Sequence, residues 1–202
     1  TASSYESYKN QIVKITFSDG KARPQSLQKP NDLYGKYDHV ARTLGKRSIS
    51  PNIEILDVST VQQSDTGLYG SVFSQRLHGL DITAGKILYY ETDSQGAISK
   101  LILNDVTGDI YQYGIVTKAE NNINNFSISG SYTYVIDGST STLRTSGSSY
   151  SVYSGNPAKF AISEGRVLSI TKLTEKYGAI SNFTESSITI DKATYPISDK
   201  AQ

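Results

Sequence analysis

The side chains of this sequence that could take part in catalysis or metal binding carry imidazole, hydroxyl and carboxylate groups. Their spacing matches few of the known catalytic or metal-binding patterns. The chain of 202 residues has two histidines, His39 and His78, and no cysteine, which excludes thiol chemistry, disulfides and cysteine-ligated metals. A serine hydrolase would need one of these histidines as its base, and the sequence has no Gly-x-Ser-x-Gly nucleophile motif. We therefore interpret His39 as a strand residue and His78 as a loop residue, neither with a catalytic role.

The acidic side chains lie where turns are expected. Glu91 and Asp93 adjoin one such turn, and Asp105 and Asp109 flank another. A glycoside hydrolase needs two carboxylates across a cleft, and neither segment has the ligand spacing of an EF-hand. Hydrogen bonding within turns explains these residues best, with a surface Ca²⁺ as the alternative. No glycine-rich segment precedes a helix, as a phosphate-binding loop requires. The sequence therefore predicts no catalytic residue, no cofactor and no metal ligand, and we expect no enzyme.

A group of basic residues suits the binding of an anionic polymer, such as a wall teichoic acid. Its members lie close together in the sequence among aromatic residues and are Lys36, Arg42, Lys46 and Arg47. An ordinary solvated surface of strands and turns is the other interpretation of this basic set. The formal net charge of the chain is +1, which argues against a nucleic-acid binder that relies on a uniformly basic surface.

Two tyrosine pairs suit stacking on a sugar or on another protein. Tyr111 with Tyr113, and Tyr132 with Tyr134, are spaced two residues apart, so the members of each pair share one face of a strand. If they are exposed they form a stacking platform, and if they point inward they form core. The inward interpretation is favoured, and the absence of tryptophan counts against sugar binding.

Alternating apolar and polar residues indicate that β-strands position all these groups. In the stretch from Ile12 to Phe17, Val13, Ile15 and Phe17 lie on the opposite side from Lys14 and Thr16, which predicts a half-buried strand. Turns are predicted because glycine supplies the positive φ of tight hairpins and Asp, Asn or Ser caps the turn locally. They are expected at 18–20, 93–96, 107–109, 137–138 and 163–165. No window shows a convincing helical period over three turns. The sequence predicts an all-β chain with about fifteen or more short strands.

A degenerate repeat organises these strands. Each copy has an apolar strand that ends at a turn glycine, and then the dipeptide Tyr34-Gly35, Tyr113-Gly114 or Tyr177-Gly178. A strand that ends in aspartate follows the tyrosine by 22 to 24 residues, at Asp57, Asp137 and Asp199.

Each repeat of about 50 to 60 residues is long enough for five or six short strands. A small barrel accommodates that many strands without exposed edges. The predicted architecture is an elongated tandem of two or three small antiparallel β-barrel-like units. We expect unit boundaries at 1–79, with a connecting loop, at 80–147, and at 148–202, the last cut short at its C-terminal end.

The segments that carry these patterns best are Leu80–Tyr90, Asp93–Leu101 and Tyr177–Ser198. They resemble the small β-barrel repeats in ectodomains of Gram-positive (Firmicutes-type) surface proteins that carry S-layer homology domains. The resemblance implies a secreted protein associated with the cell wall or S-layer, with a structural or adhesive role. It implies other modules of the same protein or cell-wall components as partners, and it supplies no catalytic set.

The predicted function is thus a non-catalytic extracellular spacer or interaction module of a bacterial surface protein. A module that binds carbohydrate or an anionic wall polymer is the first alternative, and an unrecognised hydrolase is the second. The chain begins at Thr1 and lacks methionine, so we expect a processed chain or a piece of a longer polypeptide. It has no apolar run of about 18 residues, so no membrane span is expected.

Overall fold

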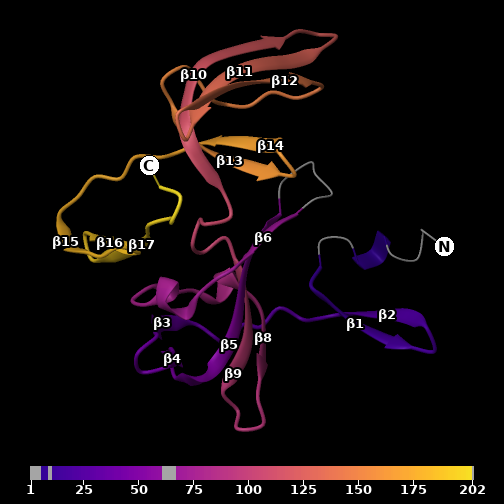
Figure 1. Cartoon of the computed structure of the whole chain (residues 1–202), viewed down its shortest axis with the longest axis vertical. Coiled ribbons are helices and arrows are strands. Elements are labelled where there is room, and N and C mark those ends of the chain that lie inside the picture. The colour runs from indigo at the N-terminus through magenta and orange to yellow at the C-terminus, as the bar shows by residue number, and fades with distance from the viewer. Residues whose placement is uncertain (1–5, 9–10, 61–66, 202) are drawn as a thin grey trace. The chain divides into compact units, whose positions relative to one another are not determined.

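The computed structural model describes residues 6–8, 11–60 and 67–201, and 57% of the structure is strand (Figure 1). The described ranges hold the strands β1 to β17 and three short 3₁₀ helices, η2 (Glu6–Tyr8), η3 (Ser74–Leu77) and η4 (Ala84–Lys86). The predicted all-β class is confirmed. Within the described part of the chain, no helix is long and apolar enough to cross a membrane.

Two compact units divide the chain, and each combines segments that are distant in sequence. Unit 1 takes residues 1–58 and 71–106, and unit 2 takes 59–70 and 107–202. This division differs from the three successive units predicted at 1–79, 80–147 and 148–202. The physical reason is long-range strand pairing: β5 pairs with β9 across the expected boundary after residue 79, and β10 pairs with β13 across the one after residue 147.

The strands of unit 1 form a hairpin and a larger mixed sheet. The hairpin joins β1 (Val13–Ser18) and β2 (Lys21–Ser26). The larger sheet has the strand order β7 (Asp81–Ile82), β3 (Gly35–Asp38), β4 (Thr43–Leu44), β5 (Arg47–Thr60), β9 (Ile98–Asn104) and β8 (Ile87–Thr92), with β6 (Gly67–Ser71) also paired to β5. β5 and β9 run parallel, whereas an antiparallel arrangement was predicted. The chain changes unit within β5, within β6 and again after Val106.

The β1–β2 hairpin exposes the face that the alternation predicted to be half-buried. Ile15 is 53% exposed and Phe17 is 78% exposed. The alternation thus predicted the strand and its two faces correctly. The prediction that the apolar face is half-buried was wrong, because the described residues leave Ile15 and Phe17 exposed. A two-stranded sheet has no second layer of its own to cover such a face.

Unit 2 contains a five-stranded and a three-stranded antiparallel sheet. The first has the order β12 (Ser139–Ser146), β11 (Ile128–Ile136), β10 (Gln112–Ile123), β13 (Pro157–Ser163) and β14 (Arg166–Lys172), and the second has the order β15 (Ile180–Phe183), β16 (Ser187–Ile190) and β17 (Ala193–Pro196). None of the sheets in the described ranges closes into a barrel, so the predicted tandem barrel repeats are not confirmed.

The Tyr-Gly dipeptides nevertheless mark a shared local structure. Each lies at the start of a three-stranded antiparallel meander, which is β3-β4-β5, β10-β11-β12 or β15-β16-β17. A Cβ added at Gly35, Gly114 or Gly178 would lie under 3.0 Å from an atom near the second turn of its meander. At Gly35 and Gly114 the close atoms include backbone, so another segment approaches too closely for a side chain. At Gly178 the close atoms are side-chain atoms of Asp191 and Ile190.

The aspartates that were predicted to close each repeat do not occupy equivalent places. Asp57 is buried inside β5, Asp137 lies in the turn between β11 and β12, and Asp199 follows β17. The constant spacing from Tyr to Asp therefore does not define a structural repeat. The common feature is the meander, whose strands differ in length from copy to copy.

Each unit has hydrophobic clusters of its own. In unit 1 the buried cluster consists of Leu33, Tyr37, Leu44, Ile49, Ile55, Leu77, Leu80, Ile82, Ile87, Ile98, Leu101 and Leu103. In unit 2 the larger cluster consists of Val116, Tyr132, Tyr134, Ile136, Val152, Ala158, Phe160 and Ile170, and a smaller one of Leu68, Tyr111 and Ala161. Tyrosine thus supplies core volume in both units.

Candidate functional site

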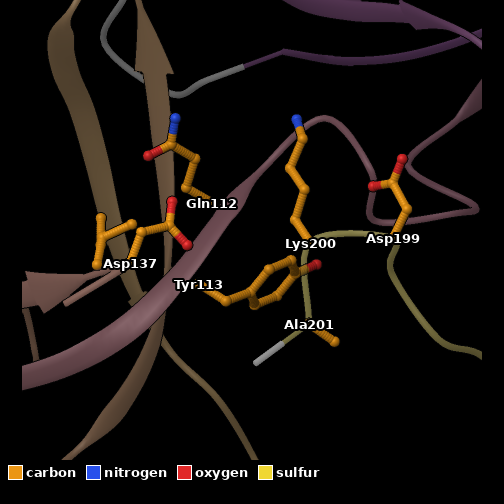
Figure 2. A pocket seen from close by; sticks show the side chains of 7 residues that line it. Gln112, Tyr113, Asp137, Asp199, Lys200 and Ala201 are labelled. Atoms are coloured by element: carbon orange, nitrogen blue, oxygen red, sulfur yellow. The ribbon is translucent and has the colours of Figure 1, made fainter.

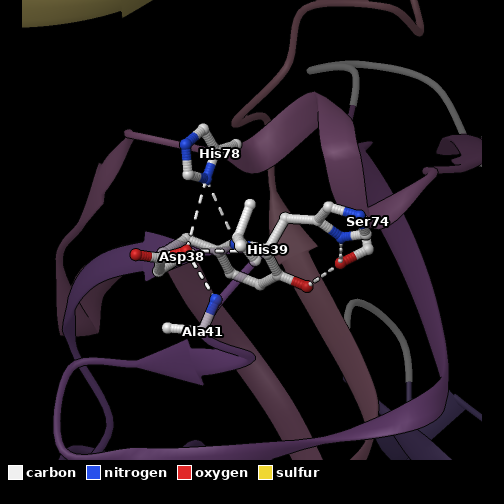
Figure 3. Close-up of polar contacts among 7 residues, drawn as sticks. Asp38, His39, Ala41, Ser74 and His78 are labelled. Atoms are coloured by element: carbon white, nitrogen blue, oxygen red, sulfur yellow. Dashed lines mark hydrogen bonds and ion pairs between the residues drawn. The ribbon is translucent and has the colours of Figure 1, made fainter.

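Both histidines of the chain meet on unit 1, together with a serine and an aspartate (Figure 3). Tyr37 and Asp38 lie in β3, and His39 follows directly after this strand. Ser74 lies in η3, and His78 follows directly after this helix. The two segments are joined by backbone hydrogen bonds from Tyr37 N–H to the Leu80 carbonyl and from Gly79 N–H to the Tyr37 carbonyl, both 2.9 Å.

The Ser74 hydroxyl is the centre of one half of this polar cluster. Its oxygen lies 2.6 Å from the Tyr37 hydroxyl and 2.9 Å from Nδ1 of His39. Tyr37 has no exposed surface, so Ser74 provides a partner for a phenol that water does not reach. Burial raises the pKa of the Tyr37 phenol, and the hydrogen bond with Ser74 offsets part of that rise.

The Asp38 carboxylate is the centre of the other half. Its Oδ1 accepts hydrogen bonds of 2.9 Å from the backbone N–H groups of Val40 and Ala41, and Nδ1 of His78 lies 3.6 Å away. The His39 backbone N–H donates to the same Nδ1 over 3.2 Å. The Ala41 hydrogen bond is the largest of the effects that hold the pKa of Asp38 below its usual range.

This arrangement does not have the order of a catalytic triad. A triad needs one histidine that contacts both the nucleophile and the carboxylate. Here Ser74 contacts His39, whereas the carboxylate of Asp38 lies beside His78 and binds backbone amides. Among the described residues, no group of three or more His, Cys, Asp or Glu is arranged to hold a metal ion. The geometry suits a polar clasp between β3 and η3.

His78 lies in a loop, as the sequence predicted, whereas His39 was interpreted as a strand residue and lies in the turn directly after β3. Sequence reasoning did not bring the two histidines together. It also missed Ser74 altogether. β3 and the segment after η3 are joined by backbone hydrogen bonds between residues about 40 positions apart, and no local motif indicates such a contact.

Removing the Ser74 hydroxyl tests the clasp. In Ser74→Ala the buried Tyr37 hydroxyl loses its partner, so the free energy of unfolding should fall by about 1–3 kcal/mol. Urea denaturation followed by circular dichroism measures this loss. The double variant Ser74→Ala/Tyr37→Phe removes both partners and should lose less than the sum of the two single variants. Ser94→Ala, at an exposed turn position, is the control and should change stability by less than about 0.5 kcal/mol. A loss at Ser74 no larger than at Ser94 would contradict the clasp.

The lowered pKa of Asp38 predicts a pH dependence. A carboxylate with a lowered folded-state pKa stabilises the fold above its unfolded pKa of about 3.9, and this contribution disappears as the pH falls through the folded-state value. The difference in urea midpoint between wild type and Asp38→Ala should therefore be largest near neutral pH and shrink below about pH 4. Asp81→Ala, at an exposed aspartate in β7, is the control, and its difference should change less with pH. A wild-type to Asp38→Ala difference that stays constant from pH 7 to 2.5 would refute the assignment.

The basic set lies on the β3-β4-β5 meander and is only partly available. Lys36, Arg42 and Lys46 are exposed on β3 and on the two turns that follow. Arg47 is committed within unit 1, because its guanidinium lies 2.6 Å from Asp32 and 5.3 Å from the ring centre of Tyr90. Binding of an anionic polymer by this set stays a prediction, in which the Arg47 charge is partly offset by its ion pair with Asp32.

The tyrosine pairs are mostly core, so the stacking platform predicted as one alternative is wrong for three of the four residues. Tyr111, Tyr132 and Tyr134 are 6%, 0% and 8% exposed, and Tyr132 and Tyr134 belong to the larger cluster of unit 2. Tyr113 is half-buried. The face shared by Tyr132 and Tyr134 is therefore the inward one.

A hollow of about 370 Å³ opens in unit 2, and we call it the β10 hollow. It is lined by Gln112, Tyr113, Ile136, Asp137, Asp199, Lys200 and Ala201. Figure 2 shows the Gln112 amide and the Asp137 carboxylate to the left of the Tyr113 ring and the Lys200 side chain above it. Of the residues predicted to bind a ligand, Tyr113 is the one that lines this hollow.

Comparison of the chain with protein-family models, with curated proteins and with solved structures finds no match.

Proposed function

We propose that the chain is a non-catalytic extracellular module of a bacterial cell-surface protein, where it acts as a structural spacer or an interaction module. The observation that carries the proposal is the use of its reactive side chains. Ser74, Asp38 and the buried tyrosines are engaged in hydrogen bonds and core packing that hold strands together.

The hydrogen bonding of the buried polar groups is consistent with the same proposal. No buried side-chain nitrogen or oxygen among the described residues lacks a hydrogen-bond partner. Complete pairing of buried polar groups is usual for a stably folded domain, which a structural module requires. The chain has no cysteine, so packing and hydrogen bonds carry its stability without disulfides.

The resemblance to repeats of Gram-positive surface proteins supplies the cellular setting of the proposal, with the cell wall or S-layer as location and neighbouring modules or wall components as partners. Antibody against the chain should label intact cells that produce it, and proteinase K added to those cells should remove the label. Label that appears only after lysis would overturn the proposed location.

The non-catalytic part of the proposal has its own test. A fluorophosphonate probe reacts covalently with an activated serine and should leave the folded chain unmodified, as judged by intact mass. Chymotrypsin under the same conditions is the positive control. Modification at Ser74 that is lost in His39→Ala would favour the hydrolase alternative instead.

A further inference from the structure

The β10 hollow is lined by groups that match the chemistry of a sugar. The Gln112 amide both donates and accepts hydrogen bonds, the Asp137 carboxylate accepts them, and the Lys200 ammonium donates them. A sugar hydroxyl also donates and accepts, so each of these groups has a partner on a polyol. The volume of about 370 Å³ lies at the lower end of the range for small-molecule sites, which suits one or two sugar rings.

The walls of the hollow are held in place before any ligand arrives. The Tyr113 hydroxyl donates to the Gly108 carbonyl over 3.0 Å, which fixes the ring. Asp137 occupies a tight turn with φ +50° between two paired strands. The segment that carries Lys200 is fixed by a 3.0 Å hydrogen bond from Asp199 N–H to the Asp109 carboxylate. Preorganised walls reduce the entropy lost on binding.

The charges of the hollow select among sugars. The ionisable groups of the lining are the carboxylates of Asp137 and Asp199 and the ammonium of Lys200, so the formal charge of the lining is −1. We propose that the β10 hollow binds the end of a neutral or amino-bearing glycan and discriminates against uronic acids and phosphate-bearing polymers. This site is distinct from the basic set on unit 1 and does not depend on the proposed spacer role.

Nuclear magnetic resonance of the ¹⁵N-labelled chain tests this proposal with three probes, namely glucosamine, glucose and glucuronic acid. Amide resonances around residues 112, 137 and 200 should shift on titration, with dissociation constants of about 1–10 mM for single sugars. Glucosamine should bind more tightly than glucuronic acid by at least about fivefold, the effect of one charge contact near a protein surface. Absent or scattered shifts, or equal affinity for these two sugars, would overturn it.

Two variants test which side chains of the β10 hollow bind the sugar and distinguish glucosamine from glucose. Asp137→Asn removes the charge but keeps the turn, because asparagine tolerates positive φ, and it should abolish the preference for glucosamine over glucose. Gln112→Ala should weaken the binding of glucose by at least about fivefold through the loss of a hydrogen-bonding amide. Asp19→Asn makes the same chemical change in the β1–β2 turn, where φ is +51°, and should leave all three affinities unchanged. A preference for glucosamine that survives Asp137→Asn refutes the assignment of this carboxylate.

Discussion

Replacing Gly114 with alanine is expected to lower the free energy of unfolding by about 3 kcal/mol or more. Gly114 lies in β10, the central strand of the five-stranded sheet, opposite Ala158 of β13. An added Cβ would lie under 3.0 Å from the Val135 carbonyl oxygen and 2.8 Å from Cγ1 of Ile136. The first of these neighbours is backbone in β11, so it cannot rotate away as a side chain would.

The loss should be measured by urea denaturation with circular dichroism, because the chain has no tryptophan to report by fluorescence. Gly85→Ala is the matched control. Its added Cβ would have Thr83 Oγ1 at 3.8 Å as its nearest neighbour, an ordinary contact, so stability should hold or rise by up to about 1 kcal/mol. If both alanine variants unfold at the same urea concentration, then β10 and β11 are not as close at Gly114 as the structure places them.

Local features of the fold could be predicted from the sequence because short-range sterics determine them. Asp19-Gly20, Asp137-Gly138 and Glu164-Gly165 were expected at tight turns, and all six residues have positive φ between paired strands. The Tyr-Gly dipeptides were expected at equivalent places of a repeat, and the crowding around Gly35, Gly114 and Gly178 marks the start of three similar meanders.

Long-range pairing could not be predicted in the same way. The parallel pairing of β5 with β9 joins Ile55 to Leu101, and the register of such a pair depends on which faces can be buried together. Without that information, about fifteen or more short strands in a repeating pattern suggested closed barrels, because closure is the simplest way to remove edges. The chain instead leaves open sheets and covers parts of their faces with its hydrophobic clusters.

The candidate sites show the same limit. A spacing of two residues places Tyr132 and Tyr134 on one face, but it does not tell whether that face is core or surface. Likewise, the sequence contains Asp38-His39 and His78, but the clasp depends on the contact between β3 and η3. The β10 hollow combines β10, the turn after β11 and the segment after β17, which are about 25 to 90 residues apart, so no motif could have indicated it.

Replacing Tyr132 with alanine is expected to cost about 3–5 kcal/mol of unfolding free energy, the usual loss for a buried aromatic side chain. Tyr132 has no exposed surface, and its ring lies 5.4 Å from that of Tyr150. Its hydroxyl donates to the Asn121 side-chain oxygen and accepts from Tyr150 N–H over 2.7 Å. The side chain thus joins β10, β11 and the segment after β12, so its removal leaves both a cavity and unpaired polar groups.

Two further substitutions separate these contributions and decide between core and binding roles. Tyr132→Phe keeps the ring and should cost about 1–3 kcal/mol through the unpaired Tyr150 N–H and Asn121 groups. Tyr153→Ala removes a tyrosine of unit 2 that is 67% exposed and should change stability by less than about 0.5 kcal/mol. If Tyr132→Ala instead unfolded like the wild type while losing affinity for a sugar, Tyr132 would be a binding residue, and its place in the core of unit 2 would be refuted.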